Sequence, residues 1–166
     1  MSISSAIIKL FATIAIVSSV VSGAPADNLQ AQALTSHNNY RAIHHVAGLR
    51  WSQVLADHAT SVSQSCIFQH NVAQGTGQNL AQGHQSMEDA VKAWYDEAEF
   101  YDYNASGPMY SNREVRHFTQ VVWKDTTEIG CGVTYCENLN QQHFYVCDYS
   151  SPGNYKDSYA ANVFRP

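Results

Sequence analysis

Apolar residues recur at steps of three and four in the first third of the chain, which predicts two amphipathic helices. The first covers residues 29–47, after a cap at Asp27 or Asn28, and ends before the next glycine. The second covers residues 54–66 after a cap at Ser52. Both predicted helices have one apolar side, so each is expected to pack on a common core.

A third helix has the strongest pattern. Ser86 and Asp89 form a capping box, in which each side chain satisfies a backbone N–H of the first turn. Its apolar stripe comprises Met87, Ala90, Val91, Trp94, Tyr95 and Ala98. Glu97 lies three residues after Trp94, near the buried side of this helix, where a carboxylate needs a partner.

The remainder of the chain is punctuated by turn residues. Residues 131–135 and 144–149 alternate well enough to be strands of one antiparallel sheet, and residues 152–154 mark a turn. Residues 75–80 contain two glycines and are expected to be loop. The run at 118–123 is ambiguous between a strand and a short helix.

The N-terminal residues indicate export. Lys9 precedes an apolar run at residues 10–21, which is too short to span a bilayer comfortably, and small residues follow it. This pattern predicts a signal peptide at residues 1–23 and disfavours a membrane anchor. Cleavage after Gly23 would leave residues 24–166, enough for a single domain and no membrane span.

Charge and cysteine content limit which type of protein this can be. The formal charge is −5, and no run of Lys or Arg is present, which argues against a nucleic-acid partner. Ten tyrosines and few charged residues favour an extracellular protein that meets small or lipidic partners. An even number of cysteines behind a signal peptide predicts two disulfides, with three pairings open for Cys66, Cys131, Cys136 and Cys147.

His117 is the first candidate for chemistry. It is followed within three residues by a hydroxyl and an amide, at Thr119 and Gln120, and then by apolar residues that can anchor it in a core. A histidine held in this way can have the fixed direction that a ligand or a general base needs. The alternative is a histidine that is simply satisfied within a polar cluster.

Several motifs together resemble the CAP superfamily, which comprises the cysteine-rich secretory, antigen five and pathogenesis-related class one proteins. The first motifs are His37-Asn38 with Arg41, and the run at 66–71. The most specific is the run HFTQVVW at 117–123, and a second signature follows at 147–154. Only two disulfides can form, which is more similar to the fungal secreted branch than to plant members.

The resemblance implies an α+β fold, a three-layer α-β-α sandwich with a central antiparallel sheet. It also implies the disulfides Cys66–Cys136 and Cys131–Cys147. The family's cavity is lined by two histidines and two acids, which correspond here to His70, His117, Glu97 and Gln78. Because Gln78 stands where the family has Glu, we expect weakened binding of a divalent metal such as zinc and weakened hydrolytic chemistry.

A second family feature is the aromatic segment after the third helix, which is implicated in sterol binding in relatives. Here it contains Phe100, Tyr101, Tyr103, Pro108, Met109 and Tyr110. Their flat apolar side chains suit a sterol or a fatty-acid-like lipid, although some of them are equally suited to packing on the sheet. The family's usual glycine before the cavity histidine is Arg116 here. Asn104 begins an N-glycosylation sequon within the segment.

Three functions follow from the resemblance. The first is a secreted protein that binds sterols or other small lipids, in host defence or virulence. The second is a scaffold-type effector that binds a protein partner, since a fold does not settle function. The third is a metal-dependent hydrolase, which is disfavoured because the sequence has no nucleophile motif and lacks an acid at Gln78.

Overall fold

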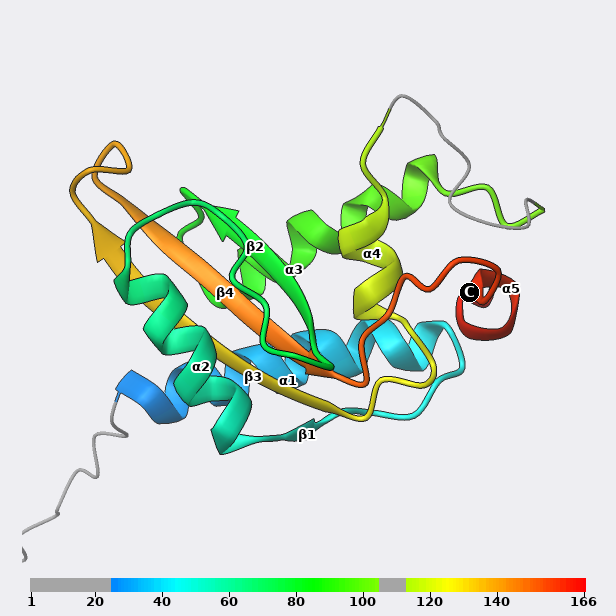
Figure 1. The fold of residues 1–166 in the computed structure, drawn as a ribbon. Helices are drawn as coiled ribbons and strands as arrows, with labels where there is room; N and C mark the ends of the chain where they lie inside the picture. The colour runs from blue at the N-terminus through cyan, green and yellow to red at the C-terminus, as the bar shows by residue number, and fades with distance from the viewer. Residues whose placement is uncertain (1–24, 105–112) are drawn as a thin grey trace, which may run out of the picture.

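The computed structural model describes residues 25–104 and 113–166 (Figure 1). The predicted signal peptide therefore lies outside the described residues. Five α-helices, one 3-10 helix and four strands are found in the described part, in the order α1 Pro25–Ile43, β1 Arg50–Trp51, α2 Gln53–Gln64, β2 Gly77–Gln82, α3 Met87–Asp96, η1 Glu97–Phe100, α4 Arg116–Val121, β3 Glu128–Cys136, β4 Gln142–Ser150 and α5 Tyr159–Asn162.

The strands form one sheet in the order β1-β3-β4-β2. Strands β2, β4 and β3 are antiparallel neighbours, whereas β1 pairs with β3 in parallel through two residues. The three long strands thus form the expected antiparallel sheet, and β1 adds a short parallel pair at its edge, so the sheet as a whole is mixed. A two-residue strand has no alternation for sequence reasoning to detect, so its partner decides its direction.

Helices cover both faces of the sheet, which confirms the α+β sandwich (Figure 1). Along β4, Val146 packs with Ala59 and Val62 of α2, while Cys147 and Tyr149 belong to the core on the side of α1, α3 and α4. Alternate residues of one strand thus supply two cores. On the α2 face, Gly130 and Gly132 are required because a Cβ there would approach the α2 backbone to 2.1 Å and 2.4 Å.

The N-caps predicted for α2 and α3 are confirmed, but the reciprocal half of the α3 capping box is not, because the Asp89 carboxylate accepts from the Ser86 hydroxyl at 2.9 Å. The Ser52 side chain accepts from the Leu55 N–H, and the Ser86 side chain accepts from the Asp89 N–H. The first helix differs at both ends, because α1 begins at Pro25 and ends at Ile43. It ends early because the chain turns back at residues 44–49, where the Arg41 side chain donates to the Ala47 carbonyl at 2.7 Å.

The secondary structure of two segments depends on contacts with distant parts of the chain. Residues 77–82, partly expected to be loop, form strand β2 and pair with β4 from Gly77↔Tyr149 to Gln82↔Phe144. The loop prediction was wrong because glycine and amide residues carry no strand signal without the partner. The run at 118–123 belongs mainly to helix α4, whose N-cap, Val115, provides no side-chain hydrogen bond.

Both disulfides form as the resemblance implies. Cys66 and Cys136 connect the segment after α2 to the end of β3, with Cα atoms 5.5 Å apart. Cys131 and Cys147 are register partners across β3 and β4. The described residues include no free cysteine.

Buried polar side chains hold α1 against the rest of the molecule. The fully buried guanidinium of Arg41 also donates to the carbonyls of Val121, Trp123 and Thr126 at 2.8–3.0 Å. The His37 ring lies between the Ala33 carbonyl, 2.7 Å from Nδ1, and the Tyr149 hydroxyl, 2.8 Å from Nε2. Nδ1 must donate to the carbonyl, so the neutral ring accepts the tyrosine proton at Nε2.

This arrangement predicts acid sensitivity. Burial lowers the pKa of His37 to about 4 from 6.5, because the charged ring would lose its hydration. The unfolded chain then binds a proton that the folded chain does not, so stability is lost as the pH falls from 6.5 towards 4. We expect His37 to contribute roughly 3 kcal/mol to this loss.

The measurement is urea unfolding of wild type and His37→Gln across this pH range. The variant should show a smaller fall in the free energy of unfolding. His143→Gln, which changes an exposed histidine, should keep the wild-type slope. Equal slopes for wild type and His37→Gln would contradict the prediction.

Candidate functional site

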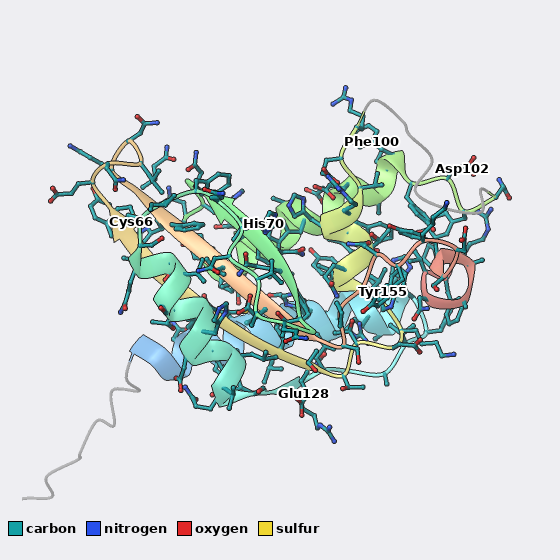
Figure 2. The ribbon with its side chains drawn as sticks, in the orientation of Figure 1. Cys66, His70, Phe100, Asp102, Glu128 and Tyr155 are labelled. Atoms are coloured by element: carbon teal, nitrogen blue, oxygen red, sulfur yellow. A yellow bond between two sulfur atoms is a disulfide. The ribbon has the colours of Figure 1, made fainter. Side chains whose placement is uncertain are left out.

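A groove lies beside β2, an edge strand of the sheet, and Figure 2 shows His70 next to this strand. Its cavity volume is about 660 Å³. The lining residues come from the loop after α2, from β2, from the start of α4 and from the turn after β4, and are Phe68, Gln69, His70, Gln78, Asn79, Leu80, Glu114, Arg116, His117 and Asn154. The structure thus brings both predicted histidines to one groove.

His117 is held by the carboxylate of Glu97. Its Nδ1 lies 2.6 Å from Glu97 Oε1, and Glu97 Oε2 accepts from the backbone N–H groups of His117 and Phe118 at 3.1 Å each. The Trp94 ring stacks near the imidazole with centroids 6.5 Å apart. Glu97 therefore has the partner that the sequence requires, and it both caps α4 and orients His117.

His70 is exposed and is held by an amide instead. Its Nδ1 lies 3.1 Å from Gln78 Oε1, which also accepts from the Asn71 N–H at 3.1 Å. Gln78 Nε2 donates to the Asn71 carbonyl and, at 2.8 Å, to Asp148 Oδ1. One groove histidine is therefore oriented by a charged group and the other by a neutral group.

Asp148 and His58 belong to the same network and were missed by the sequence reasoning. Asp148 is fully buried, and its Oδ2 lies 2.5 Å from Nδ1 of His58 on α2. Burial raises the pKa of the Asp148 carboxyl, and the hydrogen bonds from His58 and Gln78 oppose this shift. A signal was available, because Asp148 follows Phe144 and Val146 at steps of two on one face of the predicted strand.

The described side chains do not supply a complete zinc site. Within residues 25–104 and 113–166, no group of three His, Cys, Asp or Glu residues is placed to hold a metal ion. Both Glu97 oxygens already accept hydrogen bonds, and Gln78 is neutral. Two imidazoles remain as ligands, fewer than the three or four protein ligands of ordinary zinc sites.

The aromatic segment is divided between the core and the surface. Tyr101 is only 7% exposed and packs edge-on against Phe118 and Tyr103. Tyr103 is partly buried against His44 and lies beneath the Arg165 guanidinium. Phe100 is 36% exposed, with the Arg113 guanidinium over its ring. Tyr101 and Tyr103 therefore take the packing role that the sequence left open for some residues of the segment.

The other predicted residues of the segment, Pro108, Met109 and Tyr110, lie outside the described residues. Asn104, at the edge of the described part, is exposed, and its side-chain oxygen accepts from Arg165 at 2.9 Å. The side-chain nitrogen of Asn104, which is the atom that receives a glycan, is not used in this hydrogen bond.

The three layers and the two-histidine groove define an α+β sandwich domain, and the comparisons identify its family. The model of the CAP family, described as the cysteine-rich secretory protein family, matches residues 34–149. The chain belongs to this family, as the motifs indicated.

Fungal relatives support this membership. The chain is 38% identical over 134 residues to protein PRY2 of Saccharomyces cerevisiae. This alignment covers 78% of this chain and 39% of that protein. It is 36% identical over 151 residues to secreted protein RBT4 of Candida albicans, with 81% and 40% covered. It is 37% identical over 140 residues to fruiting body protein SC7 of Schizophyllum commune, with 74% and 64% covered. The chain thus spans about two fifths to two thirds of the length of these relatives.

A solved structure confirms the fold. Venom allergen-like protein 4 of Schistosoma mansoni superposes with a TM-score of 0.65 at 26% identity, covering 77% of this chain and 90% of that chain. In the part of the chain that the structure describes, no helix is both long and apolar enough to cross a membrane. The two disulfides and a relative named as secreted are consistent with an extracellular location.

We expect zinc to bind weakly, because the groove offers two imidazoles and no free carboxylate. Calorimetric titration near neutral pH should show weak binding that is lost on His117→Ala and falls on acidification, since only the unprotonated imidazole coordinates. His143→Ala, which removes an exposed histidine that does not line the groove, should bind as wild type does. Tight stoichiometric binding would show that further ligands exist.

We also expect Asn104 to carry a glycan when the protein is secreted from a eukaryotic cell, because this side chain is exposed and its nitrogen is accessible. Digestion with a peptide N-glycosidase should increase the electrophoretic mobility of the secreted protein. Asn104→Gln should migrate like the digested protein. An unchanged mobility after digestion would refute the prediction.

Proposed function

We propose that this protein is secreted and binds a small amphipathic lipid, such as a sterol or a fatty acid, in the groove between His70 and His117. The observation that carries the proposal is the lining of this groove, in which two apolar side chains, Phe68 and Leu80, stand among polar ones that include both imidazoles. A cavity of about 660 Å³ lies within the range of small-molecule sites.

Apolar side chains continue beyond the groove. Phe68, which packs one side on Phe144, is 47% exposed, and its neighbours Ile67 and Val72 are 60% and 47% exposed. Three exposed apolar residues within one short loop are unusual for a surface without a ligand. A lipid body could lie on them while its polar end reaches the imidazoles.

The lining favours binding over covalent catalysis. None of the groove residues is a serine, threonine, cysteine or lysine, so the groove has no side chain for an acyl-enzyme or Schiff-base step. His117 with Glu97 has the geometry of an oriented base, but a base alone is an incomplete hydrolytic site. A scaffold that binds a protein partner is the remaining alternative.

The test is direct binding of cholesterol and of palmitate to the purified protein, with two variants that separate the candidate lipid surfaces. Phe68→Ala should weaken binding about tenfold, because it removes apolar contact worth about 1.4 kcal/mol. Phe100 is an exposed aromatic residue of the predicted sterol-binding segment. Phe100→Ala should leave lipid binding unchanged. Tyr135→Ala, at a residue with 54% exposure that does not line the groove, is the matched control.

If Phe100→Ala abolishes binding and Phe68→Ala does not, the aromatic segment is the site and the groove is not. If wild type binds neither lipid at micromolar concentrations, the lipid proposal fails and the scaffold alternative gains. Circular dichroism of each variant checks that its fold is retained.

A further inference from the structure

The acid missing at position 78 has a counterpart on the neighbouring strand. Gln78 and Asp148 are register partners across β2 and β4, so their side chains lie on the same face of the sheet. Gln78 Nε2 donates to Asp148 Oδ1 at 2.8 Å. A carboxylate is therefore present one side chain away from the groove, in contact with the residue that holds His70.

Asp148 and the Asn71 backbone together fix which way the Gln78 amide faces, because Gln78 Nε2 donates both to the Asn71 carbonyl at 3.1 Å and to Asp148. An ionised carboxylate only accepts hydrogen bonds, so the amide must turn its NH₂ group towards Asp148. The His58 Nδ1 on the other oxygen of Asp148, at 2.5 Å, keeps this buried carboxylate in place. The carbonyl oxygen of Gln78 is then directed at the Asn71 N–H and at Nδ1 of His70.

The orientation of the amide selects the tautomer of His70. Because Gln78 presents an acceptor, His70 must donate from Nδ1, which leaves a lone pair on Nε2. Glu97 imposes the same tautomer on His117, since a carboxylate also accepts from Nδ1. Among the described residues, neither Nε2 atom of these two rings has a hydrogen-bond partner.

We propose that Asp148 is a positioning residue that acts through Gln78 on His70, and that the groove consequently presents two imidazole acceptors to its ligand. The positioning part stands on the contacts alone. The ligand part rests on the proposed lipid binding and deepens it, because two acceptors select a lipid with a hydroxyl end, such as a sterol, over one with a carboxylate end.

The charges around the groove support this selection. A ligand carboxylate can only accept hydrogen bonds, so it would face two lone pairs, with the Glu97 carboxylate behind the His117 ring. Arg116 and Glu114 both line the groove and largely cancel each other's charge, because Arg116 Nε and one terminal nitrogen each donate to Glu114 at 2.9 Å. A hydroxyl can donate to an imidazole and pays no such electrostatic cost.

The positioning part is tested by NMR of ¹⁵N-labelled histidine at neutral pH. In wild type, His70 should be the tautomer with hydrogen on Nδ1. In Asp148→Asn the residue can accept from or donate to Gln78, so only the Asn71 backbone still selects the amide orientation. The second tautomer of His70 should then become detectable beside the first. Asp148→Asn/Gln78→Glu places a carboxylate directly against Nδ1 and should restore the wild-type tautomer.

Controls keep this experiment interpretable. His117 is the internal reference, since its contact with Glu97 is untouched in every variant. Asp57→Asn removes an exposed carboxylate from the same helix as His58 and should leave both rings unchanged. Circular dichroism establishes folding. If Asp148→Asn does not fold, the double variant is compared with wild type instead. A mixture of His70 tautomers in either of these two proteins overturns the proposal.

The ligand part is tested by comparing cholesterol with palmitate near neutral pH. Wild type should bind cholesterol at least about tenfold more tightly, and Asp148→Asn should reduce this preference. Tighter binding of palmitate would overturn the selection. Absence of binding to either lipid would sink the proposed function while leaving the tautomer result valid, and an unchanged tautomer in Asp148→Asn would sink the positioning role even if lipids bind.

Discussion

The groove depends on how one short helix, α4, is held at both of its ends. Six residues are too few for a helix to be stable alone, and α4 has no side-chain cap of its own. At its start, Glu97 accepts the N–H groups of His117 and Phe118. At its end, the buried Arg41 donates to the Val121 and Trp123 carbonyls. His117 has a fixed direction because distant side chains replace the missing local caps.

The two histidines are presented to the groove by different means, although both are oriented through Nδ1. At His117 the orienting carboxylate makes direct contact, whereas at His70 an amide stands between the ring and the buried Asp148. Of the two positions where the resemblance implies an acid, Glu97 has one and Gln78 does not. The second negative charge lies deeper, shielded from solvent by the sheet and α2.

Two aromatic residues after α3 pack against the core. Tyr101 and Tyr103 pack around Phe118 and His44, so they support the helix that carries His117. Burial raises the pKa of Tyr101 to about 12, as expected for a hydroxyl with restricted access to water. Apolar exposure is concentrated instead at Ile67, Phe68 and Val72, on the loop at the opposite wall of the groove.

Sequence reasoning determined those features that neighbouring residues decide. Ser52 and Ser86 cap helices because the partner N–H groups lie three residues along the chain. β3 and β4 were predicted as strands from the residues within each run. The motifs identified the family and with it the disulfides, and they named His70, Gln78, Glu97 and His117 before their contacts were known.

Only the tertiary structure decided the rest. β2 is a strand because β4 offers it hydrogen bonds, and its own sequence of glycine and amides indicates a loop. α4 is a helix because two distant side chains satisfy its ends. Glu97 lies 19 residues before Arg116, the first residue of α4, and Arg41 lies 80 residues before Val121, the last. Asp148 joins the groove network through strand register and a contact with α2. Each of these depends on pairing between distant segments, which local patterns of polarity do not encode.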